Sequence, residues 1–264
     1  TQEFETHRFG ATYEEGEFAE GDAAHFRAVV GAAVNWQAKI DQLTDRALVQ
    51  QIPLTDGQSL PPYTTATAHA AGWIWDIPLT SRRGTGFVYS SKHMSDDEAR
   101  REFAGYLGLD PVTFAPRQIP MPIGYREQFW LGNCVALGLA QGFVEPLEAT
   151  SILVTDFSAE LLARHFPRQQ QDIPVCQPYV NQVLRYVWDG VVDFIKLHYA
   201  LSGRTEPFWQ AARGKQLIPA SLQDLLQSWQ TQPVSAYDFA HVYEPFPMES
   251  YQYVLYGMGF NQQL

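Results

Sequence analysis

The sequence predicts an α+β protein in which a mixed or antiparallel sheet packs against helices and a helical C-terminal region follows. Two observations predict this class. Runs of strand-forming residues separated by turn residues fill residues 46–90, and apolar residues recur at helical spacing after residue 150. With 264 residues, the chain has room for one or two domains and a sizeable core.

Composition narrows the class of protein further. Hydrophobic residues make up 45% and charged residues 18%, which is typical of a globular protein. The net charge of −11 argues against non-specific binding to nucleic acid or to an anionic membrane. No apolar run is long enough to span a bilayer and the N-terminus is polar, so we expect a cytoplasmic protein. Cys134 and Cys176 lack metal-ligand spacing, so we expect no metal site and two core thiols.

The predicted sheet lies in the first third of the chain. Arg46 to Pro53 predicts a strand. The segments 64–71, 72–78 and 86–90 predict further strands of one antiparallel meander. Arg82 to Thr85 is expected to form the turn before the last of them.

The predicted helices carry local start and stop signals. Ser95 and Glu98 form a capping-box pattern, and Gly108 is expected to end that helix. A second helix begins near Thr150, which can cap it, as can Ser151. The other predictions are an irregular acidic segment over residues 1–21, an extended stretch over 111–123, and helices over 23–43, 179–201 and from Ser221 onward.

The stretch from Gly132 to Phe166 organises the chain. Its first part is small and apolar, so backbone can approach another group closely there. Glu145 to Glu148 then forms an acidic turn before the predicted helix. Unpaired N–H groups and the helix dipole make the start of this helix a natural anion site. A carboxylate beside an anion site is electrostatically awkward, because the two negative charges repel, and this often marks a site of chemistry. The alternative is an ordinary helix entry with capping acids.

Two long motifs carry a family resemblance. The run G-N-C-V-A-L-G…G-F-V-E-P-L-E-A-T-S-I, which begins at Gly132, closely resembles the flavin-dependent tryptophan halogenases. Upstream, residues 73–78 read W-I-W-D-I-P and resemble the W-x-W-x-I-P motif of that family. The resemblance covers about Thr44 to Phe260.

The resemblance implies a chemistry and its partners. Such an enzyme uses reduced FAD, O2 and a halide ion for electrophilic halogenation of an indole-like or other electron-rich aromatic, either a small molecule or a tethered group. A separate flavin reductase supplies the reduced FAD. Neither the halide preference nor the oligomeric state follows from the sequence.

The resemblance also implies roles for individual residues. Glu148 stands at the position of the catalytic glutamate, where it would orient the halogenating species and stabilise or accept the proton lost from the ring. Thr150 and Ser151 match the positions whose backbone N–H groups hold the halide. The residues implied on the flavin and tunnel side are Trp73, Trp75, Pro78, Gly142 and Pro146. For the two tryptophans, packing on a sheet face is the alternative.

Two departures from the family pattern matter. No G-x-G-x-x-G fingerprint occurs, and none of the four lysines stands in the context of the catalytic lysine. We therefore expect a halogenase-like fold that lacks most of the nucleotide-binding βαβ unit, with exposed apolar surface where that unit would dock, weak flavin binding and no halogenation by this chain alone. Tyr243, Phe246 and Tyr251 lie in the region comparable to the substrate pocket, but the pattern there makes free tryptophan a doubtful substrate.

The predicted organisation has three parts. Residues 1–62 would be a remnant of the flavin domain, residues 63–175 the sheet with the flavin and halide sites, and residues 176–264 the helical substrate side. Two other functions stay open: an FAD-dependent aromatic monooxygenase of the same superfamily, and a relative that only binds an aromatic ligand or a partner.

Overall fold

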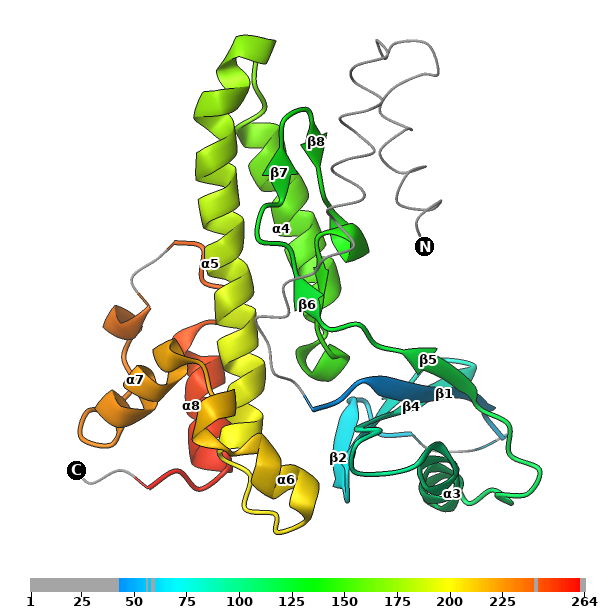
Figure 1. Ribbon diagram of the computed structural model, residues 1–264. Helices are drawn as coiled ribbons and strands as arrows, with labels where there is room; N and C mark the ends of the chain where they lie inside the picture. Colours follow the sequence, from blue (N-terminus) through cyan, green and yellow to red (C-terminus); the bar gives the residue numbers. More distant parts are fainter. Residues whose placement is uncertain (1–42, 56, 58–59, 240–241, 262–264) are drawn as a thin grey trace, which may run out of the picture. The chain divides into compact units, whose positions relative to one another are not determined.

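A computed structural model describes residues 43–55, 57, 60–239 and 242–261 (Figure 1). The described chain divides into two compact units. One contains residues 124–192 and 236–247, and the other contains residues 43–123, 193–235 and 248–261. The predicted irregular segment 1–21 and most of the predicted helix 23–43 lie outside the described residues.

The second of these units contains a five-stranded antiparallel sheet in the order β2-β3-β4-β1-β5 (Figure 1). Its strands are β1 (Arg46–Pro53), β2 (Thr65–His69), β3 (Gly72–Pro78), β4 (Arg82–Tyr89) and β5 (Arg117–Pro120). The predicted bounds of β1 and β3 and the predicted meander are confirmed. The extended stretch predicted over residues 111–123 contains β5 at the edge of the sheet.

The turn predicted at Arg82 to Thr85 is wrong, because these residues begin β4. Arg83 pairs in register with Pro78, and its guanidinium binds the carboxylate of Asp76 on β3. The chain reverses just before, where the Leu79 N–H donates to the Arg82 carbonyl at 2.9 Å. A cross-strand ion pair therefore holds Arg83, one of the two arginines that the sequence pattern assigned to a turn.

One face of the sheet packs against α3 (Asp96–Leu107). Ile74 and Phe87, paired across β3 and β4, are fully buried, and the ring of Phe87 lies 6.3 Å from that of Phe103 on α3. The predicted capping box at Ser95 and the left-handed stop at Gly108 are both confirmed.

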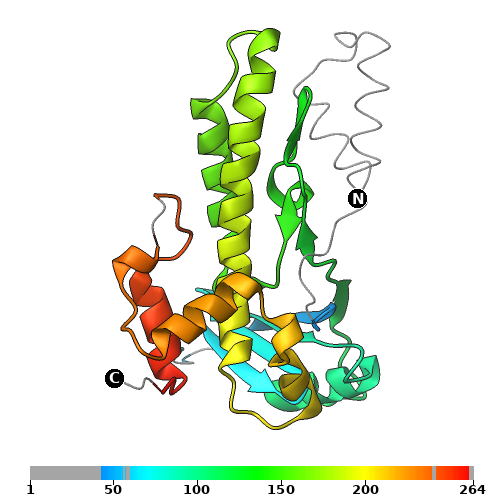
Figure 2. The ribbon, with the colours of Figure 1, turned by 60° about the vertical axis from the view of Figure 1, so that its left-hand side comes forward.

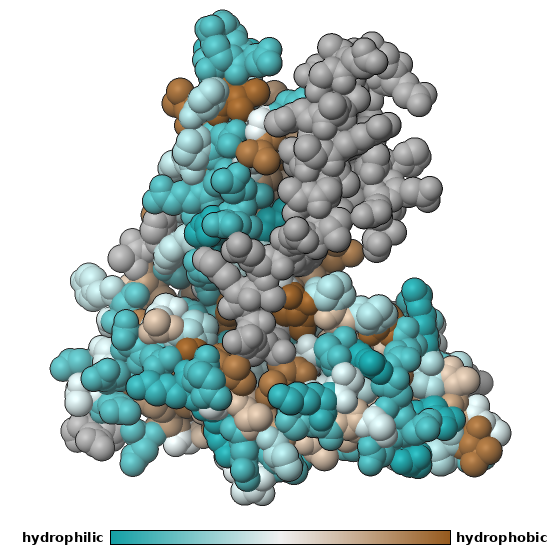
Figure 3. Space-filling view, viewed as in Figure 1, coloured by the Kyte–Doolittle hydropathy of each residue, from teal (hydrophilic) through white to brown (hydrophobic). Residues whose placement is uncertain are grey.

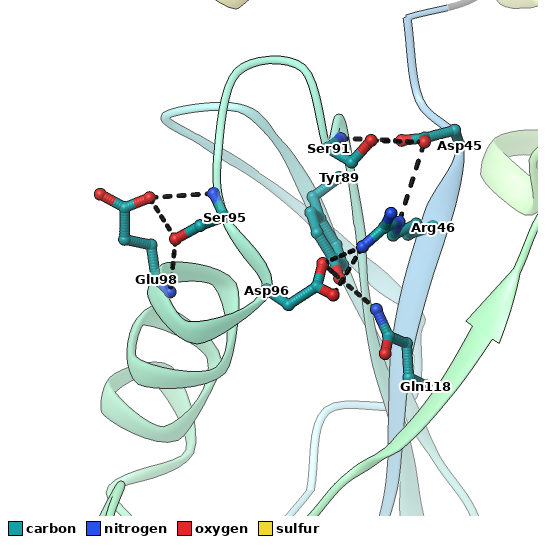
Figure 4. Close-up of polar contacts among 8 residues, drawn as sticks. All are labelled: Asp45, Arg46, Tyr89, Ser91, Ser95, Asp96, Glu98 and Gln118. Carbon is teal, nitrogen blue, oxygen red and sulfur yellow. Dashed lines mark hydrogen bonds and ion pairs between the residues drawn. The ribbon is translucent and has the colours of Figure 1, made fainter.

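A polar network joins α3 to three strands of the sheet (Figure 4). Arg46 on β1 binds the Asp96 carboxylate, which also accepts from the Tyr89 hydroxyl on β4 at 2.8 Å. Gln118 on β5 donates to that hydroxyl at 3.0 Å. Hydrogen bonds from Gln118 and Tyr89, with the Arg46 charge, hold the pKa of Asp96 below its ordinary value. Burial is the largest of the causes that raise the pKa of Tyr89 to about 12.

Helices complete this unit: the end of α5 (Ile173–Ala200), α6 (Pro207–Ala212), α7 (Ala220–Trp229) and α8 (Met248–Gly257). Trp209 on α6 donates its indole N–H to the carbonyl of His69 on β2 at 2.7 Å. The predicted start of α7 at Ser221 is one residue late, and no side chain caps this helix. The predicted start of α5 near residue 179 is also late: the helix begins at Ile173, with Pro174 in its first turn, where a missing N–H costs little.

The other unit is built on α4 (Thr150–Arg164) and the first part of α5, which lie side by side in two views (Figures 1 and 2). Two short ribbons precede them, β6 (Gly124–Tyr125) with β9 (Gly142–Phe143), and β7 (Trp130–Leu131) with β8 (Cys134–Val135). The 3-10 turns are η1 (Gly138–Ala140), η2 (Pro146–Glu148) and η3 (Gln170–Asp172) here, and η4 (Lys215–Leu217) and η5 (Ala236–Asp238) later in the chain.

The apolar residues that recur at helical spacing along α4 do not all lie on its buried face. Ile152 is 84% exposed and Leu153 50% exposed, whereas Val154 and Leu161 are buried. Ser158 joins the buried face because its hydroxyl has hydrogen-bond partners there. At the end of this helix pair Phe166 and Val175 are exposed, and Figure 3 shows hydrophobic surface in that region.

The cysteines differ in their surroundings. Cys134 on β8 is buried as predicted, and burial raises the pKa of its thiol to about 11, so the thiol stays protonated. Cys176 on α5 is only half-buried, so the prediction of a second core thiol is wrong. Among the helices that the structure describes, none has the length and apolar character needed to cross a membrane.

Candidate functional site

The acidic turn and the start of α4 meet at a left-handed residue. The turn η2 ends at Glu148, which is half-buried, and α4 begins at Thr150. Between them Ala149 has φ 53° and ψ 30°. Among the non-glycine residues that the structure describes, Ala149 alone has a positive φ. Left-handed backbone is costly for a residue with a Cβ, so the junction is strained.

The prediction that Thr150 or Ser151 caps α4 is wrong. The cap position is taken by Ala149, whose side chain has no polar atom and makes no capping hydrogen bond. Thr150 and Ser151 are instead the first two helical residues. The first turn of a helix attracts anions through its N–H groups and the helix dipole, and an anion site at this junction stays a prediction.

A cavity of about 200 Å³ lies beside this helix start. Its lining residues are Gly138, Leu139, Gln141, Gly142, Ser151, Ile152, Val154, Thr155 and Trp188. It brings together two residues of the predicted site, Gly142 and Ser151. Pockets that enclose a whole drug-sized ligand usually measure roughly 300–1,000 Å³, so this cavity suits a small ligand or one part of a larger one.

The glycine at position 142 is explained by packing. On β9, opposite Tyr125 of β6, a Cβ at Gly142 would lie 2.7 Å from both the Tyr125 Cβ and the Cζ2 of Trp188. Tyr125 also stacks on Trp188, with ring centroids 5.6 Å apart and an interplanar angle of 12°. Close approach, which the sequence predicted for this run, thus sets the back wall of the cavity.

Sequence reasoning missed two residues of this cavity, Gln141 and Trp188. A signal for each was present. Gln141 is a polar residue inside the apolar run V-A-L-G-L-A-Q-G-F-V, and Trp188 follows Leu184 by one helical turn on the predicted apolar face of α5. No local pattern shows that the two side chains meet.

The tryptophans of the W-x-W motif belong to the sheet of the other unit. Trp73 is 3% exposed, and its buried indole nitrogen has no hydrogen-bond partner among the residues that the structure describes. Its ring lies 6.0 Å from that of Trp75, which covers the Cα of Gly86 on β4. Pro78 is half-buried at the end of β3. The packing that explains Trp75 is the sheet-face alternative, and a role beside flavin stays a prediction.

The three residues of the predicted substrate pocket belong to two different units. Tyr243 and Phe246 lie in the unit of α4, where the Tyr243 hydroxyl is 2.8 Å from that of Tyr179 and its ring is 5.7 Å from that of Phe157. Phe157 follows Thr150 on α4 by roughly 10 Å of helix. Tyr251 is buried in the other unit, with its ring 4.8 Å from that of Phe194.

Pro146, the remaining predicted residue on the flavin side, is exposed at the first position of η2. Glu145, which precedes it, is fully buried. Within the described ranges, no group of three or more His, Cys, Asp or Glu side chains could hold a metal ion.

Comparison with known proteins decides the family. Residues 20–263 match the tryptophan halogenase family. This chain belongs to that family. It is 37% identical over 217 residues to the tryptophan 6-halogenase SttH of Streptomyces toxytricini, an alignment that covers 81% of this chain and 41% of SttH.

Solved structures agree. The tryptophan halogenase of Shewanella frigidimarina is 40% identical, with a TM-score of 0.83 over 87% of this chain and 44% of that chain. BrvH, a flavin-dependent halogenase of a Brevundimonas species, is 35% identical, with a TM-score of 0.78 over 89% of this chain and 47% of that chain. The chain therefore spans less than half the length of each of these relatives.

Proposed function

We propose that this chain supplies the halide-binding and catalytic-glutamate portion of a flavin-dependent halogenase that acts on an indole-like or other electron-rich aromatic. The observation that supports the proposal most strongly is that the residues of the family motif lie together at the start of α4. Glu148 ends a 3-10 turn, α4 starts two residues later without a side-chain cap, and a cavity adjoins Ser151.

The residues at the cavity fit a flavin and a halide ion. Glycines at its rim allow close approach of a flat ring, and the first turn of α4 offers N–H groups and the positive end of the helix dipole to an anion. Gly138, Gly142 and Ser151 would contact the flavin, with Pro146 beside them. Reduced FAD, supplied by a separate flavin reductase, would provide with O2 the oxidising power that turns halide into an electrophile.

Each remaining site residue has a defined task in this proposal. The N–H groups of Thr150 and Ser151 bind the halide. Glu148 orients the halogenating agent and accepts the proton that the aromatic ring loses. Trp73, Trp75 and Pro78 line the passage between flavin and substrate and exclude bulk water, and Tyr243, Phe246 and Tyr251 contribute to the substrate side.

Other parts of the proposal concern the organisation of the chain. The fold would be an incomplete FAD-dependent monooxygenase-like fold, divided by function into residues 1–62, 63–175 and 176–264. The protein would act in the cytoplasm on a small or tethered aromatic. In support, SttH is named a tryptophan 6-halogenase and BrvH a flavin-dependent halogenase.

The halide site can be tested without turnover. Ser151→Pro deletes one N–H from the first turn of α4, where proline is tolerated, and Ser151→Ala keeps it. Chloride binding is read from the broadening of the chloride NMR signal. We expect about tenfold weaker binding in Ser151→Pro, since an ion loses one charge-assisted hydrogen bond, and native binding in Ser151→Ala. Equal binding in both variants would refute the halide site.

The catalytic role needs a second assay. The complete protein is assayed, because no halogenation by this chain alone is expected, and it receives reduced FAD, O2, bromide and indole. Glu148→Gln should lower any bromination at least about 100-fold. Glu160→Gln is the matched control: it carries the same change on the exposed side of α4. An oxygenated product without bromination would favour the monooxygenase, and full activity of Glu148→Gln would refute the proposed role.

A further inference from the structure

A buried amide lies between the two long helices of the cavity unit. Gln141 has 0% exposure. Its Oε1 is 3.0 Å from the indole Nε1 of Trp188 on α5 and 3.1 Å from the hydroxyl of Ser158 on α4. Its Nε2 donates to the carbonyl of Ala136 at 3.4 Å. One side chain therefore connects α4, α5 and the segment that carries the glycines.

The chemistry of the partners fixes the orientation of this amide. An indole nitrogen can only donate, so the atom facing Trp188 must be the oxygen of Gln141. Ser158 has a single hydroxyl hydrogen to donate. Its Oγ lies 2.5 Å from the carbonyl oxygen of Val154, so that carbonyl and the Oε1 of Gln141 compete for the same hydrogen. The hydrogen bond from the Trp188 indole to the Gln141 oxygen has no such competitor, since the indole N–H has no other acceptor among the described residues.

The backbone of Gln141 is also hydrogen-bonded on both sides. Its N–H donates to the Gly138 carbonyl at 3.0 Å, and its carbonyl accepts from the Arg126 N–H at 3.0 Å. Both Gln141 and Trp188 line the cavity beside Ser151, and Trp188 is 3% exposed. The amide therefore sets where the indole wall stands relative to the glycine segment.

We propose that Gln141 is a positioning residue for the flat aromatic ring system of the flavin, and that it acts by holding the Trp188 indole as the wall of the cavity. The inference rests on the proposed function, since it assumes that a flavin occupies this cavity. Gln141 need not touch the flavin. A buried amide that only satisfies the core would affect stability and leave ligand affinity unchanged.

The test uses the 264-residue chain labelled with nitrogen-15 in its seven tryptophans. Trp188→Phe assigns the Trp188 indole signal and removes the donor. Gln141→Met keeps the length of the side chain but removes both hydrogen-bonding groups. Gln171→Met makes the same change at an exposed position of the same unit. Oxidised FAD is the titrant, and circular dichroism establishes that each variant is folded.

We expect FAD to shift the Trp188 indole signal in the unsubstituted chain and in Gln171→Met. In Gln141→Met the indole N–H should exchange faster with solvent, and FAD should bind about tenfold more weakly, the size of one lost buried hydrogen bond. Trp188→Phe should weaken FAD binding similarly, and the double variant should lose little more, because the two side chains act as one pair.

The outcomes separate this inference from the proposed function. If FAD binds but leaves the Trp188 signal unmoved, or if folded Gln141→Met binds FAD normally, the positioning role is refuted while the proposed function stands. Losses that add fully in the double variant would also overturn it. If the unsubstituted chain binds no FAD at any concentration tested, the flavin-contacting part of the proposed function fails, and the inference that rests on it is refuted too.

Discussion

The close packing around Gly142 predicts that replacing this glycine by alanine destabilises the protein. Gly142→Ala adds one methyl group at a point where the Tyr125 Cβ and the Trp188 ring would each be 2.7 Å away. The Tyr125 Cβ is attached directly to the β6 backbone, and the Trp188 indole is held by its bond to Gln141. Neither neighbour can move aside alone, so β9 must shift and the cavity wall with it.

The size of the effect follows from two opposing contributions. A methyl group forced into a well-packed core costs about 1–3 kcal/mol, and contacts this short favour the upper half of that range. Replacing a glycine stabilises by about 0.4–1 kcal/mol through the unfolded chain. The net loss should be about 1–2.5 kcal/mol, which at a urea slope of about 2 kcal/mol per molar lowers the midpoint by roughly 0.5–1.2 M.

The control is a second glycine with open surroundings. Gly105 lies on the exposed side of α3, and a Cβ there would meet no atom within 4 Å. Gly105→Ala should therefore raise stability by about 0.5–1 kcal/mol, as expected inside a helix. Urea unfolding followed by tryptophan fluorescence measures both variants. A midpoint for Gly142→Ala at or above that of the parent chain would refute the packing argument.

Three further predictions concern the sheet unit. Gly86→Ala should displace the Trp75 indole, because the new Cβ would lie 2.0 Å from its Cζ2; an unmoved Trp75 NMR signal would contradict this. A hydrogen bond from Gln118 lowers the pKa of Asp96, so the stability that the ionised carboxylate contributes should be lost as pH drops below about 4. Urea midpoints measured from pH 5 to 2 should therefore fall less in Asp96→Asn than in the parent chain. Burial raises the pKa of Tyr89 to about 12, so stability should fall as pH rises from about 10 to 12; Tyr89→Phe should lessen that fall, and an equal fall would count against it.

Elements with complete local signals could be predicted from the sequence. The helix α3 has a capping box at its start and a left-handed glycine at its end, and both are formed by residues close in the chain. The bounds of β1 and β3 follow from runs of strand-forming residues between turn residues. In these elements, tertiary packing agrees with local preference.

Elements decided by distant partners could not be predicted. Arg83 lies in a strand, opposite Pro78, and its side chain binds Asp76 two residues before Pro78 on the neighbouring strand, a partner that the local sequence of the turn does not reveal. Ile152 is exposed although it is apolar, whereas Ser158 is buried because Gln141 and Val154 offer it acceptors. The cavity wall joins residues 141 and 188, 47 positions apart, and no local periodicity encodes that meeting.

The junction at Ala149 connects the fold to the proposed chemistry. A left-handed conformation costs an L-residue such as alanine roughly 1–2 kcal/mol, and a glycine there would avoid most of that cost. The strain persists at the single residue that separates Glu148 from the first N–H groups of α4. A polar residue in ordinary cap geometry would instead place its own oxygen on those N–H groups. Ala149 gives the first turn of α4 no side-chain oxygen at the cap position, directly after the Glu148 carboxylate, and the proposed halide site requires N–H groups that the cap residue does not occupy.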